Sequence, residues 1–227
     1  MVDNNLEILM LNLPVFSKLT SQERHLLATT AICKKYNSEE YIALQGEVWP
    51  YVFIIINGEI RVQKSSSEGR NLGSWRLSSD QMFWSPSIFD GNPLPASLEI
   101  SQICEICMWN KDQILPIIQK NRLAVWDLCV TLIQRIRQAS DMVQGIAFQP
   151  LASRLASLLI NQNDGLLSSS VKRSMTLDEM ASMMGTTPVM VCKLLSRFAE
   201  QEIIKVSRSE FEFIDKEKLT QIAGRNV

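Results

Sequence analysis

The residues best suited to chemistry lie in the segment 186–197, TTPVMVCKLLSR, where polar side chains recur at helical spacing. A lysine there can reach guanine acceptors, and an arginine can meet a phosphate. A valine can only make apolar contact, best with a thymine methyl group. The side chains facing away from the apolar stripe of this segment are Pro188, Val189, Cys192, Lys193, Ser196 and Arg197. This set indicates noncovalent recognition of DNA.

Two short helices are expected to position these side chains. Thr176 and Glu179 have the spacing of a capping box, and Gly185 is suited to end the first helix in a left-handed conformation. Thr187 or Thr186 can cap the second helix, with Pro188 at its first position. The inward apolar faces are Leu177, Met180, Ala181 and Met184, then Val191, Leu194, Leu195 and Phe198. This is helix-turn-helix geometry, and an ordinary helical hairpin is the alternative.

A small β-wing is expected after the second helix. Residues 203–214 alternate between apolar and polar types and turn near Ser207–Glu210. Cations flank the motif and could contact phosphate or serve only as solvated surface: Lys172, Arg173, Lys205 and Arg208. The candidate DNA-contacting residues are Thr176, Thr187, Pro188, Val189, Cys192, Lys193, Ser196, Arg197 and Arg208.

Between about Cys33 and Trp109 the pattern is that of short strands with regular turns. Apolar runs at 51–56, 59–63, 73–77, 97–101 and 103–109 are separated by Gly, Asn, Ser and Pro. Asn57–Gly58 predicts a hairpin turn, and 65–73 predicts a longer polar turn. An all-β sandwich or barrel is therefore expected, preceded by helices within 6–30.

Residues 111–147 are expected to be helical again, with a long apolar stripe beyond Pro116. A helix of about 25 residues spans roughly 37 Å, longer than a small β-domain needs for its own packing. A second copy of the chain would bury the stripe better than the β-domain alone. The proposed dimer interface is Val125, Leu128, Leu132, Ile136, Ala139 and Val143. A surface loop is expected at 161–170.

The composition excludes several classes of protein. The formal net charge is −1, so DNA binding must come from a local basic patch. No apolar run reaches the roughly 18 residues of a membrane span, and the N-terminus lacks the basic region of a signal peptide. One histidine and no acid–base or nucleophile constellation argue against an enzyme. We therefore expect a cytoplasmic protein.

The five cysteines are expected to be free thiols, because they are odd in number and scattered. Only Cys104 and Cys107 are close in sequence. On a strand they would point to opposite faces, which makes a poor chelate and a poor disulfide. A redox role for these two is left open.

In this order, the motifs resemble the catabolite-activator/fumarate-nitrate regulator (Crp/Fnr) family of bacterial transcription factors. LQGEVWPYVFIIINGEIRV resembles the family's β-roll signature, and LDEMASMMGTTPVMVCKLLSRFAEQEII resembles its DNA-binding helices. The resemblance implies an α+β fold with an effector-sensing β-roll or jelly-roll domain at 1–120, a dimerisation helix at 121–148 and a winged helix-turn-helix domain at 149–227. It also implies a homodimer on palindromic double-stranded DNA, with RNA polymerase as a candidate partner.

The recognition helix departs from the family's usual residues. The resemblance places base-reading positions at Pro188, Val189, Cys192 and Lys193, where well-known members carry Arg or Glu at the first two and Arg at the last. Lysine lacks the planar fork of arginine. We therefore expect a sequence preference unlike the family's usual half-sites. The alternative is a ligand-binding or protein-interaction module that no longer reads a specific operator.

The loop FWSPSIFDGNPLPAS at 83–97 bears on the signal. In cyclic-nucleotide-binding members the matching segment carries a Glu for the ribose and an Arg for the phosphate. Here the matching positions are Phe83, Trp84, Leu94 and Pro95. No Lys or Arg occurs between Leu77 and Asn110, so cyclic nucleotide is not expected. An N-terminal cysteine cluster for iron–sulfur is missing, and His25 is the only histidine for haem.

Two interpretations of this domain stay open. In one, a small apolar effector binds a pocket lined by Phe83, Trp84, Ile88, Phe89 and Leu94. In the other, the protein's own side chains fill the pocket, because aromatic residues fill cores as readily as they line sites.

Overall fold

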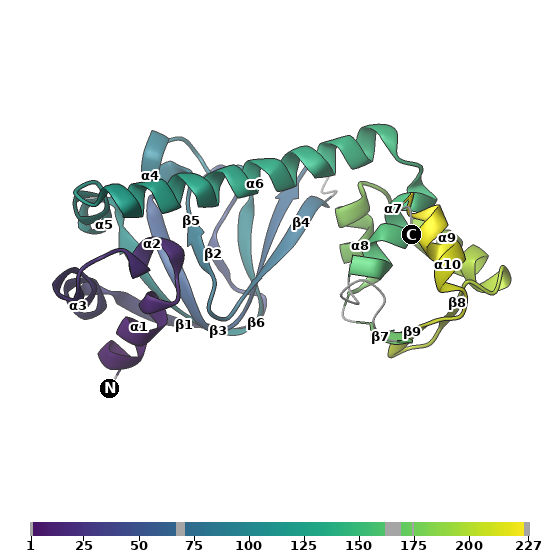
Figure 1. The fold of residues 1–227 in the computed structure, drawn as a ribbon, viewed down its shortest axis with the longest axis horizontal. Helices are drawn as coiled ribbons and strands as arrows, with labels where there is room; N and C mark the ends of the chain where they lie inside the picture. The colour runs from purple at the N-terminus through teal and green to yellow at the C-terminus, as the bar shows by residue number, and fades with distance from the viewer. Residues whose placement is uncertain (1, 67–70, 162–168, 174, 225–227) are drawn as a thin grey trace. The chain divides into compact units, whose positions relative to one another are not determined.

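The computed structural model describes residues 2–66, 71–161, 169–173 and 175–224. They fall into two compact units, Met1–Gln138 and Ala139–Val227. The helices are α1 (Val2–Leu11), α2 (Pro14–Ser17), α3 (Ser21–Thr30), α4 (Ser87–Asp90), α5 (Lys111–Ile118), α6 (Arg122–Phe148), α7 (Leu151–Asn161), α8 (Leu177–Met184), α9 (Pro188–Glu200) and α10 (Lys216–Ile222) (Figure 1). The strands are β1 (Ile32–Tyr36), β2 (Tyr41–Ala43), β3 (Tyr51–Ser65), β4 (Asn71–Ser78), β5 (Met82–Trp84), β6 (Ser97–Asn110), β7 (Ser170–Lys172), β8 (Ile204–Val206) and β9 (Glu210–Phe213).

The first unit is built on an antiparallel sheet in the order β1-β6-β3-β4, with β2 paired to β6 and β5 paired to β3. Each face of this sheet carries a hydrophobic cluster. The helix-side cluster joins the sheet to α1, α2, α3, α5 and the first half of α6. The roll-interior cluster holds buried side chains of β2, β3, β4 and β6. The expected β-roll is confirmed.

The hairpin predicted at Asn57–Gly58 is wrong. β3 runs unbroken from Tyr51 to Ser65, and its register with β6 shifts on both sides of Asn57. Gly58 has φ of +92°, and a Cβ atom there would lie 2.3 Å from the Ile103 carbonyl oxygen. Asn57–Gly58 is therefore an irregularity inside β3 and not a turn. Glycine is needed at position 58 because the backbone of β6 approaches it so closely.

The same irregularity changes which residues of β3 face the roll interior. Phe53 and Ile55 face the roll interior before it, while Ile60 and Val62 do so after it. The inward positions thus change from odd to even numbers, which is the effect of an extra residue in a strand. The five short strands predicted from the sequence are segments of three longer strands, β3, β4 and β6.

Side-chain caps fix where two helices of the first unit begin. The Thr20 side chain accepts from the Glu23 backbone N–H, and the Glu23 carboxylate accepts from the Thr20 N–H, closing a capping box on α3. The helical segment predicted at 111–147 divides in two, because α5 ends at Ile118 and Asn121 caps the start of α6. The long helix itself is confirmed.

The expectation of free thiols is wrong for two of the five cysteines. Cys33 on β1 and Cys107 on β6 form a disulfide, and their Cα atoms are 4.0 Å apart. They stand directly opposite each other in the antiparallel register. Cys104 lies in the roll-interior cluster and Cys107 in the helix-side cluster, so the prediction that these two face opposite ways is confirmed.

The second unit is a helical domain with a three-stranded sheet in the order β7-β9-β8. Helices α7, α8, α9 and α10 share one hydrophobic cluster with this sheet. The predicted wing is confirmed, since β8 and β9 pair antiparallel around the turn at Ser207–Glu210. Strand β7 was not anticipated. The turn predicted at 65–73 is too long, because β3 extends to Ser65 and β4 begins at Asn71; its centre, 67–70, lies outside the described residues. Most of the loop predicted at 161–170 also lies outside them.

Candidate nucleic-acid interface

The two helices of the motif begin and end where the sequence predicts. The Thr176 hydroxyl accepts from the Glu179 backbone N–H at 3.2 Å, completing a capping box on α8. Gly185 then adopts φ of +63° and ends α8. The Thr187 hydroxyl accepts from the Met190 N–H, and Pro188 occupies the first position of α9. Local capping chemistry therefore fixes the turn between the helices.

Packing then decides which face of α9 stays free. Val191, Leu195 and Phe198 are buried against α7 and α8. Arg154 of α7 donates to the Met184 carbonyl at the end of α8, which ties a third helix to the turn. Since the apolar stripe is buried, the opposite side of α9 is presented to solvent as the prediction required.

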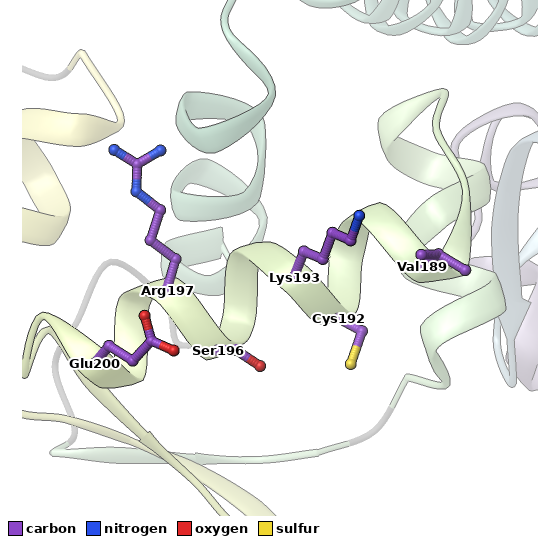
Figure 2. A pocket seen from close by; sticks show the side chains of 6 residues that line it. All are labelled: Val189, Cys192, Lys193, Ser196, Arg197 and Glu200. Atoms are coloured by element: carbon purple, nitrogen blue, oxygen red, sulfur yellow. The ribbon is translucent and has the colours of Figure 1, made fainter.

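The free side of α9 forms a shallow concave surface of about 420 Å³. It is lined by Val189, Cys192, Lys193, Ser196, Arg197 and Glu200 (Figure 2). Val189 is 63% exposed, and Cys192, Lys193, Ser196 and Arg197 are exposed as well. Pro188 is half-buried. Five of the predicted DNA-contacting residues thus share one surface, and Glu200 is an addition that the sequence analysis missed.

The charges on this surface are available for a ligand. Figure 2 shows Lys193 and Arg197 extending from one side of the helix, while Cys192 and Ser196 point to another. Within the described part of the chain, neither Lys193 nor Arg197 has a hydrogen bond or ion pair to another side chain. Two cations and one acid, Glu200, give the surface a local positive balance despite the net charge of the whole chain.

The wing and its neighbours supply further cations. Ser207 accepts hydrogen bonds from the backbone of Ser209 and Glu210, which holds the tip and leaves Arg208 exposed. Lys205 pairs with Glu212 at 3.6 Å, and Arg173 lies over the ring of Phe211. Lys172 is exposed. Lys205 therefore has an anionic partner, whereas Arg208 and Lys172 are exposed.

The residues proposed for an effector pocket do not meet on one face of the sheet. Phe83 and Leu94 pack with the roll-interior cluster, and Leu94 is 2% exposed. Trp84 and Ile88 belong to the helix-side cluster instead. Phe89 is 46% exposed and stacks on Trp84 with ring centroids 6.1 Å apart. Alternating side chains on β5 send Phe83 and Trp84 to opposite sides, which sequence proximity had concealed.

Aromatic rings pack continuously along the roll interior. Phe83 stacks on Phe53 at 5.4 Å, and Phe53 meets Trp49 at 5.9 Å. The Gly46 N–H donates to the Leu94 carbonyl and the Leu94 N–H donates to the Glu47 carbonyl, which tethers the 83–97 loop to the turn at 46–47. Phe53 is buried, while Trp49 and Phe83 are half-buried and pack against its cluster.

The same loop carries a negative charge. The Asn92 backbone N–H donates to the Asp90 carboxylate at 2.9 Å, which holds the pKa of Asp90 below its ordinary value. Asp90 is therefore ionised at neutral pH, next to a loop without Lys or Arg. An anionic ligand would meet repulsion at this point rather than a counterion.

The predicted dimer stripe is only partly free. Leu128 is 7% exposed and Leu132 is half-buried, and both pack in the helix-side cluster of their own chain. Val125, Ile136 and Val143 are 36%, 62% and 66% exposed, and Ala139 is exposed. The first half of α6 therefore uses part of the predicted stripe internally.

A different row of α6 residues stays exposed at alternating steps of three and four. This α6 seam comprises Trp126, Cys129, Ile133, Ile136, Ser140, Val143 and Ala147. Trp126 is 68% exposed and Ile133 is 48% exposed. A 3–4 repeat is the spacing of a coiled-coil seam. The sequence carried this signal, but a choice between two overlapping stripes needed the packing of the β-roll.

A β-roll sheet followed by a long helix and a winged helix-turn-helix defines a DNA-binding transcription regulator. Residues 153–222 match the Crp-like helix-turn-helix domain family, and residues 33–121 match the cyclic nucleotide-binding domain family. The chain belongs to the Crp/Fnr family of transcription regulators, and this family is not one of enzymes. Among the described residues, no helix is long and apolar enough to span a bilayer.

Known relatives and solved structures match most of the chain. The cAMP-activated global transcriptional regulator CRP of Haemophilus influenzae is 24% identical over 175 residues, which cover 75% of this chain and 78% of that protein. FixK2 of Bradyrhizobium japonicum superimposes with a TM-score of 0.71 at 16% identity, covering 87% of this chain and 100% of that one. A Crp/Fnr regulator of Eubacterium rectale gives 0.73 at 17% identity, covering 93% and 98%.

Proposed function

We propose that this regulator acts as a homodimer in which α9 of each copy enters the major groove at one half of a palindromic DNA site. The observation that carries the proposal is the exposed outer face of α9, which combines two cations with short polar and apolar side chains. Two recognition helices related by a twofold axis would contact half-sites about 34 Å apart, one turn of DNA.

Base reading is assigned to the N-terminal half of α9. Val189, at the start of the helix, would contact a thymine methyl group, and Lys193, one turn later, would reach a guanine. Cys192 and Ser196 point to another side of the helix from Lys193 (Figure 2). Arg197 and the wing-tip Arg208 would meet phosphates. The half-site should therefore contain T and G at fixed spacing.

Salt dependence separates these roles. Each phosphate contact adds about 0.9 to the slope of log binding constant against log salt concentration. Arg197→Ala should therefore lower the slope by about 2 per dimer, with little change in which sequence is preferred. Lys193→Ala should instead weaken discrimination at one base pair of each half-site. If both variants changed only the slope, the rival function, a module that no longer reads an operator, would be favoured.

Dimerisation is assigned to the α6 seam. In a parallel pair of helices, residues at seam positions lie opposite their own copies. Cys129 is an exposed thiol at such a position, so it provides a direct test. In a Cys192→Ser background, mild oxidation should give a covalent dimer on a non-reducing gel. The matched Cys129→Ser, Cys192→Ser variant should stay monomeric on that gel. A covalent dimer formed equally by both variants would contradict the assignment.

We also propose that the β-roll does not bind cyclic nucleotide, although its fold is that of such a domain. The support is the continuous aromatic packing of Trp49, Phe53 and Phe83, together with the lack of Lys and Arg between Leu77 and Asn110. Isothermal titration with cyclic AMP should give no binding heat at ligand concentrations saturating a cyclic AMP-activated relative. A saturable heat would overturn the proposal.

We further propose a cellular location and a transcription partner. We propose that the regulator works in the cytoplasm, because a regulator of transcription must reach chromosomal DNA. RNA polymerase is the partner through which DNA binding would affect transcription. A small apolar effector stays a candidate ligand, and Phe89, the exposed ring of the 83–97 loop, is where its contact would be sought first.

A further inference from the structure

The Cys33–Cys107 disulfide joins a solvent-facing residue to a core residue. Cys33 is exposed near the start of β1, directly after α3. Cys107 is 0% exposed and belongs to the helix-side cluster, which also holds Ala124 and Leu128 of α6. The register of β1 and β6 places the two residues opposite each other over a separation of 74 residues. One residue of the pair therefore lies at the solvent-facing edge of the sheet, and the other is shielded by the fold.

We infer that this pair is a thiol–disulfide exchange site, at which an external thiol of the glutathione class attacks the sulfur of Cys33. Exchange begins with a thiolate attacking one sulfur of the disulfide, and Cys33 is the residue of the pair that lies at the protein surface. Lys35 lies two residues along β1 on the same face as Cys33, and its partner Glu105 is 3.7 Å away. Lys34 is also exposed. The ion pair of Lys35 with Glu105 and the contact of Lys34 with the Tyr36 ring leave the surroundings of Cys33 close to electrically neutral, so access to Cys33, not charge, carries the inference.

The chemistry balances in two steps. A glutathione thiolate bonds to Sγ of Cys33, the Cys33–Cys107 bond breaks, and its electron pair leaves on Sγ of Cys107, which takes up a proton. A second glutathione thiolate then attacks the mixed disulfide, giving oxidised glutathione and the Cys33 thiolate. Two electrons have passed to the pair, and oxidised glutathione reverses the process.

The neighbouring free thiol, Cys104, does not compete with the external thiol in attacking the disulfide. Burial, with a smaller effect from the charge of Glu105, raises the pKa of Cys104 to about 11. Cys104 is therefore protonated at neutral pH, and the thiolate is the form that attacks a disulfide. It also lies on the opposite face of β6 from Cys107. This makes Cys104 the natural control residue.

The setting explains why the pair should be reversible. Cellular compartments that hold chromosomal DNA in most bacteria keep thiols reduced, and disulfides found there are usually transient or redox-sensing. Reduction would leave β1 held to β6 by its strand ladder, and α3 by the hydrogen bonds of Trp109 to Leu27 and Gln113 to Thr30. The fold has other ties at this junction, so opening the disulfide does not require unfolding.

The test uses the full chain, equilibrated without oxygen in glutathione buffers, quenched in acid and alkylated in denaturant. Intact mass should show three modified cysteines at the oxidising end and all five at the reducing end. About a hundredfold change in the ratio of squared reduced to oxidised glutathione should carry the pair from mostly closed to mostly open. Peptide mapping should assign the change to Cys33 and Cys107.

Variants show which of the two sulfurs the external thiol attacks. Cys107→Ala should collect a glutathione adduct on Cys33, while Cys33→Ser, a change at an exposed position, should collect none on Cys107 in the folded protein. Cys104→Ala should titrate like the parent chain. Three modified cysteines at every ratio would show a permanent structural disulfide, and five throughout would show no pairing. Either result, or an adduct on Cys107 rather than Cys33, would overturn the inference, whatever the DNA experiments show.

Discussion

Replacing Ile136 with alanine tests the α6 seam with a magnitude that follows from exposure. Ile136 is 62% exposed in one copy of the chain. Burying a whole isoleucine side chain stabilises by about 1.5–3 kcal/mol, so the exposed share is worth about 1–2 kcal/mol in each copy. A symmetric interface loses this amount twice, or about 3 kcal/mol. Ile136→Ala should therefore raise the dimer dissociation constant roughly a hundredfold.

Sedimentation equilibrium over a range of protein concentrations measures this constant directly. Ile103→Ala is the matched control, because Ile103 is 69% exposed but lies on β6 away from the seam, and it should leave the constant unchanged. Leu128→Ala should act differently, lowering the free energy of unfolding by about 2–5 kcal/mol because Leu128 is a core residue. The reasoning is refuted if Ile136→Ala dimerises like the parent, or if the parent itself is monomeric at micromolar concentration.

Three further predictions concern single positions. Lys193→Ala should cost about 1–3 kcal/mol of binding at the preferred site and little on random DNA, as fluorescence anisotropy would show; equal losses on both would contradict base reading. Gly58→Ala should lower thermal stability more than Gly91→Ala, because both glycines have positive φ but only a Cβ at Gly58 would meet the Ile103 carbonyl, 2.3 Å away; equal shifts in melting temperature would contradict the close approach. Alkylation of Cys104 in the folded chain should stay slow from pH 7 to 9 and rise only as pH approaches about 11, since its thiolate forms there; fast alkylation at pH 8 would contradict its burial.

The DNA-binding unit was predictable because its signals are local. Thr176, Gly185, Thr187 and Pro188 each act within one helical turn, so their types and spacing suffice to place both helices. Strand β7 escaped notice because three residues after a polar stretch give no periodicity. Glu200 was overlooked because it follows the positions usually considered for base reading.

Longer-range features were not accessible in the same way. Asn57–Gly58 has the composition of a turn, but pairing with β6 along 51–65 decides that the strand continues. The Cys33–Cys107 disulfide depends on a register between segments 74 residues apart. No local pattern encodes either contact, which explains why both predictions failed.

The dimer stripe shows a third cause of error. Residues 125–143 carry two overlapping apolar rows, and their spacing alone does not distinguish the row through Leu128 from the other. The β-roll buries Leu128 and leaves Trp126 and Ile133 outside. An amphipathic pattern indicates that a face will be buried, but only the tertiary structure shows which partner covers it.

Selection of binding sites from random double-stranded DNA tests the central claim most directly. The purified chain should enrich a palindrome whose half-sites are about one helical turn apart, with T and G at the positions assigned to Val189 and Lys193. Enrichment at those positions should relax in the Lys193→Ala variant. Salt-sensitive binding without any enriched sequence would contradict the account and show that α9 no longer reads an operator.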